Sequence, residues 1–411
     1  MLGNTVMKEK RRRSEREKRR RGDIAKGFLS FPASSFPLIS ASPLLRFILK
    51  ACLIFLLFIP LAYSAGFPDF KPALPGWKYV FPRDHGAHPD FKTEWWYYNG
   101  HLRDASGNEY GYQMTFFRVA LVPAPSPSGS SRWRFRDVYL AHLTVTDVQG
   151  KTFLFKEEAE RGSLGLAGAD EGRYRVWVDT WKADQDGRGH QITAGNEELG
   201  FSLGLSPLRA PIIHGINGVS QKGSGEGRAS HYYSLTRMAT TGILRIRGRE
   251  IPVSGLSWMD HEFGSNQLAD YQTGWDWFSL QLSNGVDVMV YQLRGINGEA
   301  DPYSSGTLVL PDGQSIHLPW PAIRLHSYGS WKSPKSGATY PASWEINLPQ
   351  YELALALTPV LADQELLTPK STRVTYWEGK VTVRGTYKGR PIEGQGYVEL
   401  TGYDKRYRPK I

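Results

Sequence analysis

The stretch EWWYYNGHL at residues 94–102 decides the fold. Side chains alternate between the two faces of a β-strand, so Glu94, Trp96 and Tyr98 share one face and their neighbours share the other. Both faces carry aromatic side chains, and both must therefore be covered by protein. We expect one face to line the interior of a barrel and the other to pack against a further layer.

Short runs of the same kind recur along the chain, rich in aromatic and β-branched residues and separated by Gly, Asn, Asp and Pro. Little of the sequence has the period of a long amphipathic helix. The runs predict strands at 93–102, 110–121, 138–148, 173–181, 231–238, 242–251, 275–282, 286–294, 343–348, 351–357, 373–383 and 396–400. Regular short strands with turn signals between them are typical of an all-β barrel or sandwich.

The sequence also repeats itself across two halves. Glu94 and the tryptophans after it open a strand whose neighbour ends in Arg118, and Asp276-Trp277-Phe278 opens another whose neighbour ends in Arg294. Both elements occur in the same order at a separation typical of a domain, which favours a duplicated module. We therefore predict two tandem antiparallel β-barrels, one over residues 65–268 and one over residues 269–411.

The net charge of +10 for the 411 residues belongs mainly to the N-terminal segment. Residues 1–64 hold thirteen Lys or Arg and four Asp or Glu, which leaves 37 basic and 36 acidic residues in the remainder. A nearly neutral body argues against a surface that follows nucleic-acid phosphates. We expect no nucleic-acid partner.

Residues 1–64 have the layout of an export signal. A basic region up to Lys50 precedes an apolar run over residues 51–61, and small residues follow it up to Ala65. The run is about half the length needed to cross a bilayer. The segment predicts export to the periplasm or beyond; the alternative is an uncleaved anchor in the inner membrane, which would be the protein's only membrane contact. Cys52, the single cysteine, lies at the start of the apolar run and not at its end, so it does not match a lipidation site.

The segment GLSWMDHEFG at residues 255–264 is the main candidate for chemistry. Three consecutive ionisable residues inside an otherwise apolar strand are costly to bury. Trp258 and Asp260 share one face, whereas His261 lies on the other. If Asp260 faces an aromatic lumen, burial raises its pKa and makes it a proton donor near neutral pH. The structural alternative is an Asp–His or Glu–Arg network that closes the barrel.

Two further groups of residues could contribute to a site. HYYSLTR at 231–237 puts His231 and Tyr233 on one face, where His231 could orient a carboxylate or a water. Glu94 could lie at the end of an aromatic pocket, or it could bond an arginine or a tryptophan N–H as part of the barrel core. Among metal donors, the loop cluster of Asp84, His85, His88 and Asp90 matches no known zinc spacing. We predict no metal and no cofactor.

These segments resemble the lipocalin-like family that contains the bacterial AttH proteins and the carotenoid 1,2-hydratases. The matching stretches are 94–102, 231–238, 255–268 and 274–282, and the likeness runs from about residue 80 to 402. The resemblance implies two lipocalin-like barrels in tandem. It also implies that Asp260 occupies the position of the hydratase aspartate that protonates an isolated isoprenoid double bond. The neighbours of that aspartate differ: Trp258, Met259, Glu262 and Phe263 replace tyrosine, histidine, asparagine and tryptophan.

Three hypotheses follow from this sequence. The first is an exported protein that binds an apolar, lipid or isoprenoid-like ligand. The second is a hydro-lyase of the carotenoid 1,2-hydratase type with Asp260 as general acid. The third is a partner of a membrane transporter. The predicted catalytic residues are Asp260 and His231, and the predicted ligand-binding residues are Glu94, Trp96, Tyr98, Tyr233, Trp258 and His261.

Overall fold

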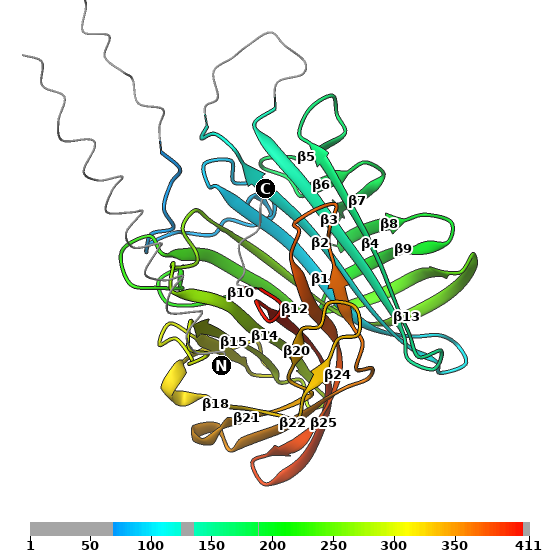
Figure 1. The fold of residues 1–411 in the computed structure, drawn as a ribbon, viewed down its shortest axis with the longest axis vertical. Coiled ribbons are helices and arrows are strands. Elements are labelled where there is room, and N and C mark those ends of the chain that lie inside the picture. The colour runs from blue at the N-terminus through cyan, green and yellow to red at the C-terminus, as the bar shows by residue number, and fades with distance from the viewer. Residues whose placement is uncertain (1–68, 125–134, 188, 406–411) are drawn as a thin grey trace, which may run out of the picture. The chain divides into compact units, whose positions relative to one another are not determined.

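The computed structural model describes residues 69–124, 135–187 and 189–405, and this part of the chain is almost entirely β-structure (Figure 1). The helices in the described ranges are three short 3-10 helices: η1 (Arg83–His85), η2 (Trp320–Ala322) and η3 (Pro349–Tyr351). None of the described helices is long and apolar enough to span a bilayer. The predicted export signal or anchor at 1–64 lies outside the described residues.

The first sheet is a nearly closed antiparallel barrel in the order β4-β3-β2-β1-β13-β12-β9-β8-β7-β6-β5. The two ends of this order approach each other, since β3 and β4 contact β5 and β6. Two short strands, β10 and β11, pair with β12 outside this order. Its strands are β1 (Thr93–Arg103), β2 (Glu109–Ala120), β3 (Asp137–Asp147), β4 (Thr152–Arg161), β5 (Ala167–Ala169), β6 (Arg175–Val178), β7 (Trp181–Asp186), β8 (Gly189–Gly195), β9 (Leu199–Pro207), β10 (Ile212–Ile213), β11 (Ser220–Gln221), β12 (Ala229–Ile246) and β13 (Arg249–Gly264).

The second sheet is a half-barrel in the order β17-β16-β15-β14-β25-β24-β22-β21-β18, with β23 paired to β24. Its strands are β14 (Gln272–Leu282), β15 (Asp287–Gly295), β16 (Ser305–Val309), β17 (Ser315–Pro319), β18 (Arg324–Tyr328), β21 (Ser343–Leu348), β22 (Leu353–Pro359), β23 (Glu365–Leu367), β24 (Thr375–Tyr387) and β25 (Arg390–Thr401). A separate hairpin pairs β19 (Trp331–Lys332) with β20 (Thr339–Tyr340).

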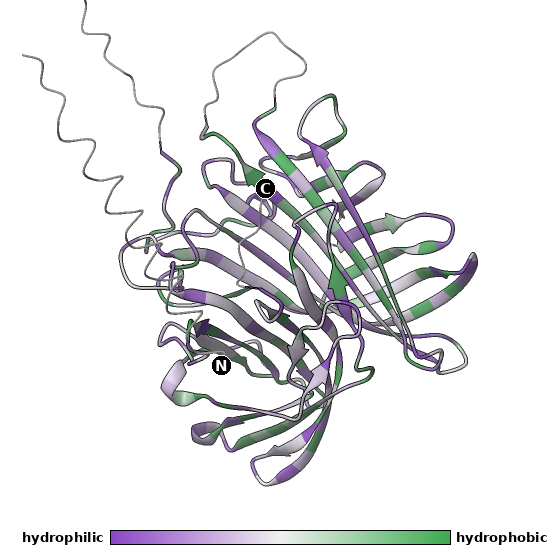
Figure 2. Cartoon of the chain, in the orientation of Figure 1, coloured by the Kyte–Doolittle hydropathy of each residue, from purple (hydrophilic) through white to green (hydrophobic). Residues whose placement is uncertain are grey.

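The predicted all-β class with two tandem antiparallel β-barrels is confirmed, with a nearly closed first barrel and a half-barrel as the second. The first sheet ends at Gly264 and the second begins at Gln272. The described residues all belong to one compact unit, so the division into two separate domains stays a prediction. Hydrophobic and hydrophilic residues alternate along many strands of both sheets (Figure 2), as expected where one face packs inward.

The repeat read from the sequence corresponds to an ion pair in each sheet. Glu94 of β1 pairs with Arg118 of the neighbouring strand β2, and Asp276 of β14 pairs with Arg294 of the neighbouring strand β15. β1 lies between β2 and β13, and β14 lies between β15 and β25, so the two pairs occupy corresponding places. This agreement supports an origin by duplication.

β1 is buried on both faces, as its sequence predicts. Trp96 and Tyr98 belong to the core of the first barrel, whereas Tyr97 packs with Trp258 against Trp277 of the second sheet. Polar contacts join the sheets at the same place: the Asn99 side-chain amide donates to Ser279 Oγ over 3.3 Å. A strand covered in this way connects the barrel core to the joint between the sheets.

Gly100 of β1 allows close packing inside the first barrel. A Cβ at this position would overlap the Tyr112 ring and Ser257 Oγ. We expect Gly100→Ala to destabilise the protein by about 1–3 kcal/mol through overpacking, measured as a lower midpoint of thermal unfolding. Gly204→Ala in β9 is the matched control, because the atoms nearest its Cβ belong to the flexible Gln191 side chain. Equal midpoints for the two variants would contradict this account of Gly100.

Candidate active site between the two sheets

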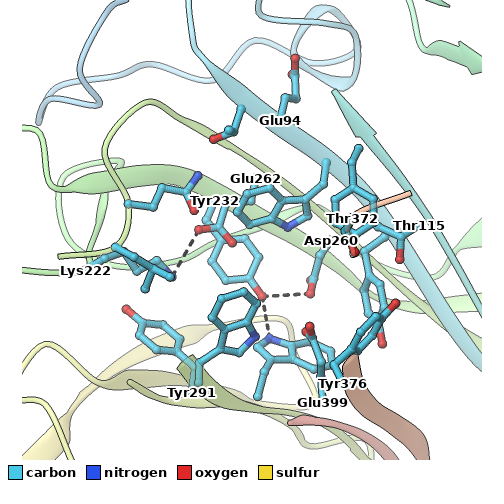
Figure 3. Close-up of a pocket in the computed structure, with 18 of the residues that line it drawn as sticks. Glu94, Thr115, Lys222, Tyr232, Asp260, Glu262, Tyr291, Thr372, Tyr376 and Glu399 are labelled. Carbon is cyan, nitrogen blue, oxygen red and sulfur yellow. Dashed lines mark hydrogen bonds and ion pairs between the residues drawn. The ribbon is translucent and has the colours of Figure 1, made fainter. Parts of the chain in front are cut away.

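A pocket lies between the two sheets, where β1, β2, β12 and β13 face β14, β15, β24 and β25 (Figure 3). Its volume is about 170 Å³, taken as the space open to the centre of a water molecule. Eight of the 22 residues that line it are aromatic. The aromatic lining residues are Trp95, Tyr97, Phe117, Tyr232, Trp275, Trp277, Tyr291 and Tyr376.

Asp260 reaches this pocket from β13. Alternation along the strand turns Trp258 and Asp260 toward the second sheet and Met259 toward the core of the first barrel, as the sequence predicts. The Asp260 side chain is almost wholly buried, with 4 % of its surface exposed. The aromatic surroundings of this carboxyl are Trp258 and Tyr232 on the outer face of the first sheet and Trp277 of the second sheet, and not the lumen of the first barrel.

Three side chains donate hydrogen bonds to the Asp260 carboxyl. Trp258 Nε1 donates to Oδ1 over 2.6 Å, Ser234 Oγ also donates to Oδ1, and the Tyr232 hydroxyl donates to Oδ2 over 2.9 Å. Burial raises the pKa of Asp260 to about 7, against the lowering effect of these three bonds. The carboxyl is therefore divided between its acid and its carboxylate forms near neutral pH.

Two more carboxyls enter the pocket from the second sheet. Glu378 of β24 and Glu399 of β25 are direct cross-strand neighbours. Burial raises the pKa of Glu378, and repulsion from Glu399 raises it further. Burial also raises the pKa of Glu399, and Asp260 adds to this effect. Figure 3 shows Glu399 beside Asp260, so carboxyls from both sheets meet at one end of the pocket.

Another part of the pocket contains a lysine whose positive charge is balanced by a glutamate. Lys222 Nζ lies 3.3 Å from Glu262 Oε1 and 3.8 Å from the centre of the Tyr291 ring. Burial lowers the pKa of Lys222, but Glu262 and Tyr291 together outweigh burial and the net pKa is raised. Lys222 follows β11 in the Gly-rich segment between β10 and β12. This segment therefore contributes directly to the pocket wall.

Glu94 belongs to a different network, on the first-barrel side of β1. Its carboxylate accepts from Arg118 Nε over 3.0 Å and contacts His88 Nδ1 and His261 Nε2 at 2.8 Å each. Burial would raise the pKa of Glu94, but Arg118 and the two histidines hold it well below its usual range. Glu94 also borders the pocket, yet Figure 3 shows its side chain apart from Asp260 and Glu399.

The donor atoms of His88, Glu94 and His261 lie within 4.8 Å of one another, a spacing that a metal ion can bridge. The Arg118 guanidinium balances the Glu94 charge, so the cluster is an ion-pair network that fastens the segment before β1 to the barrel. Of the loop donors considered from the sequence, Asp84 lies 3.4 Å from His88 Nε2. The exposed Asp90 pairs instead with Lys71, and His85 contacts the Tyr233 hydroxyl.

The other predicted site residues also lie on the first-barrel side. His231 Nδ1 contacts the Gly218 carbonyl at 2.8 Å, and its ring packs on Trp77. Trp96 Nε1 donates to the His85 carbonyl. The hydroxyl of Tyr98 contacts His190 Nδ1, and that of Tyr233 contacts His261 Nδ1. Of the eight predicted residues, Asp260 and Glu94 line the pocket, and Trp258 lies beside Asp260 and donates to it. The other five lie, with the Glu94 carboxylate, on the first-barrel side.

Sequence reasoning missed most partners of Asp260. Tyr232 and Ser234 alternate with His231 and Tyr233 on β12, so they hold the acid while the predicted pair faces away from it. Glu378 and Glu399 were missed although each is an acidic residue inside a predicted strand. An ionisable residue inside a predicted strand is the same signal that identified Asp260.

The pocket joins three features. A buried carboxyl near its titration midpoint faces a second carboxyl, and aromatic rings form the wall around both. A neutral carboxylic acid in such a place can donate a proton. Aromatic faces stabilise a nearby cation, by about 2 kcal/mol or more where water is excluded. The arrangement suits acid–base chemistry on an apolar molecule.

The chain resembles proteins of one family over nearly its whole described length. A family model described as AttH-like matches residues 72–403. The crystal structure of a candidate AttH protein from Nitrosomonas europaea is 32% identical, with a TM-score of 0.73, and the match covers 81% of this chain and 99% of that one. The resemblance predicted from the sequence is thereby confirmed.

Two curated relatives are enzymes by name. Dehydratase asqC of Emericella nidulans is 24% identical over 219 residues, which are 51% of this chain and 60% of that protein. Kievitone hydratase of Fusarium solani subsp. phaseoli is 24% identical over 223 residues, which are 50% of this chain and 58% of that protein. The match thus spans less than two thirds of either relative. The chain is related at low identity to a hydratase and a dehydratase.

The raised pKa of Asp260 has a consequence for stability. An unfolded Asp loses its proton near pH 4, so the folded state loses stability as the pH rises from about 4 to about 7, at most on the order of 4 kcal/mol. Asn at this position stays neutral at every pH. We expect Asp260→Asn to raise the thermal unfolding midpoint relative to wild type more at pH 8 than at pH 5. A pH-independent difference between the two proteins would contradict the buried, titrating carboxyl.

Proposed function

The chain belongs to the AttH-like family, and we propose that within this family it is a hydro-lyase whose active site is the pocket between the sheets. The observation that carries the proposal is the meeting of Asp260 with Glu378 and Glu399 behind aromatic walls. The names of its two curated relatives support a reaction that adds or removes water. The apolar lining supports an alkene of lipid or isoprenoid type as the substrate class.

The reaction begins with proton transfer from the Asp260 carboxyl to the less substituted carbon of the double bond. The π electrons form the new C–H bond, and the more substituted carbon becomes a cation. Rings such as Trp277 and Tyr232, which lie beside Asp260, stabilise this cation. His231 has no part in this scheme because it lies on the face of β12 opposite to Tyr232 and Ser234, away from Asp260.

Water then adds through its oxygen to the cationic carbon. The extra proton on that oxygen passes to the Glu399 carboxylate, which leaves a neutral alcohol. The net change is alkene plus water to alcohol, without an oxidant or a reductant. The same groups in reverse order protonate an alcohol and remove water, so the site suits a hydratase or a dehydratase.

A binding protein without chemistry is the second candidate. The aromatic walls of the pocket and the Lys222–Glu262 pair could hold an apolar ligand that has a polar end. Export through residues 1–64 and work with a membrane transporter remain proposals that rest on the sequence alone. Retention of an apolar compound without conversion favours this second candidate.

Hydration can be tested directly with the full-length protein. Acyclic isoprenoids with trisubstituted double bonds are incubated in H₂¹⁸O, and mass spectrometry detects the labelled alcohol. We expect Asp260→Asn to lower kcat by about 10²-fold or more, the usual contribution of a general acid. Glu365→Gln is the matched control, because this buried carboxyl of the second sheet contacts Ser333, Ser336 and Tyr340 and does not line the pocket.

The outcomes separate the two candidates. Labelled alcohol from wild type and Glu365→Gln, with little from Asp260→Asn, supports the hydro-lyase. Compounds that stay bound but unchanged in all three proteins overturn the reaction and support binding. If none of the three proteins retains or converts any compound, both candidates fail.

The pH dependence of the rate provides an independent check. Because the reaction needs the protonated acid and the pKa of Asp260 is raised to about 7, kcat/KM should fall above that pH, by about tenfold per unit. Ser234→Ala removes one hydrogen bond to the carboxylate and should move this decline to higher pH. A rate that stays level through pH 7 and above would argue against Asp260 as the proton donor.

A further inference from the structure

A line of hydrogen bonds runs from the pocket wall toward the surface. Tyr376 of β24 lines the pocket, and its hydroxyl lies 2.6 Å from Nδ1 of His142 on β3. His142 Nε2 lies 2.7 Å from Ser371 Oγ, and Ser371 Oγ lies 2.5 Å from Glu157 Oε2. The half-buried Glu157 of β4 ends the line at the outer side of the first barrel.

The direction of every bond follows from the last one. The Glu157 carboxylate accepts the Ser371 hydroxyl proton, so Ser371 Oγ must accept the N–H of His142 Nε2. The His142 Nδ1 lone pair is then free to accept the Tyr376 hydroxyl proton. The backbone N–H groups of Lys370 and Ser371 also donate to Glu157, at 3.1 and 3.0 Å, and hold its carboxylate in place.

His142 is suited to pass protons rather than to carry a charge. Its side chain is buried, with 1 % of its surface exposed, among the rings of Phe117, Phe155 and Tyr376. Burial lowers the pKa of His142 to about 3, so the ring is neutral, with one N–H and one lone pair. A neutral imidazole can take up a proton at one nitrogen while it releases the proton on the other.

The inner end of the line lies among the groups of the proposed reaction. Tyr376 and Glu378 are two residues apart on β24 and therefore share a face. Both line the pocket with Asp260 and Glu399, and Figure 3 shows Tyr376 beside Glu399. Pocket water, which the reaction itself consumes, can connect the Tyr376 hydroxyl to these carboxyls.

We propose that Tyr376, His142, Ser371 and Glu157 form a proton relay between the pocket and the solvent. The inference deepens the proposed hydro-lyase function and, as a catalytic device, rests on it. Hydration leaves Asp260 without its proton and Glu399 with an extra one. The relay resets both carboxyls while the substrate or product closes the pocket to bulk water.

The proton balance closes over two transfers. In the outward transfer, the Glu399 proton reaches Tyr376, the Tyr376 proton moves to His142 Nδ1, the Nε2 proton to Ser371, and the Ser371 proton to Glu157 and the solvent. In the inward transfer, a solvent proton runs the same path in reverse and the last proton reaches Asp260. One transfer in each direction also restores the original tautomer of His142, so the ring need not rotate.

The relay can be tested without any substrate. Full-length protein is transferred rapidly into D₂O at about pD 5.5, where Asp260 is protonated, and infrared spectroscopy follows the shift of the buried carboxylic acid C=O bands as deuterium enters. Asp260→Asn and Glu378→Gln identify which bands belong to the pocket. We expect exchange at these bands to be at least about tenfold slower in His142→Gln and Tyr376→Phe than in wild type.

Glutamine suits this test because its amide can donate and accept hydrogen bonds but cannot pass a proton through. His190→Gln is the matched control, since His190 is a buried histidine that contacts Tyr98 in the first barrel and does not line the pocket. If His142 and Tyr376 only tied the two sheets together, replacing either one would loosen the pocket. The pocket carboxyls of these variants would then exchange deuterium faster than those of wild type. Glu157→Gln, a change at the half-buried end of the line, tests the relay if the buried variants fold poorly.

Slow exchange in the relay variants and normal exchange in His190→Gln support the proposal. Exchange at or above the wild-type rate in His142→Gln and Tyr376→Phe overturns the proposed relay. If Glu157→Gln is the only relay variant that folds, exchange at the wild-type rate in that variant overturns the relay as well. The reaction is judged separately. If the ¹⁸O assay detects no hydration while exchange slows as expected, the proton path stands and the hydro-lyase proposal falls.

Discussion

The pairing of β1 with β13 is the contact on which the other features of the protein depend. β1 and the second half of β13, residues 257–264, are buried on both faces, whereas antiparallel sheets commonly leave one face to the solvent. One face completes the core of the first barrel. The other face, with Tyr97, Trp258 and Asp260, must be covered by something else, and the second sheet covers it. The pocket is the space that this packing leaves between two aromatic surfaces.

Much of the fold could be predicted from local sequence. The strand expected at 93–102 is Thr93–Arg103, and the one expected at 343–348 is Ser343–Leu348. Alternation and turn residues are properties of short segments, so they can be read without knowledge of the partners. The closure of each sheet cannot be read in this way, because it depends on strand order and twist. The second sheet accordingly proved to be a half-barrel.

The candidate site was harder to predict for a physical reason. Asp260 stood out because a charge inside an apolar strand is costly, and the same cost applies to Glu378 and Glu399. What the sequence does not contain is the register that sets Ser234 opposite Asp260 and Glu378 opposite Glu399. His231 was grouped with Asp260 by motif, whereas the alternation of β12 sends Tyr232 and Ser234 to the acid. His142 offered no local signal, since its partners are more than 200 residues away.

The meeting of Asp260 from one sheet with Glu378 and Glu399 from the other has a consequence for how the site can vary. Neither sheet alone holds this group, so the pocket exists only where the two sheets pack together. Substitutions in the second sheet can change what surrounds Asp260 while the strand that presents this acid stays the same. A site divided in this way offers one route from a common scaffold to different reactions.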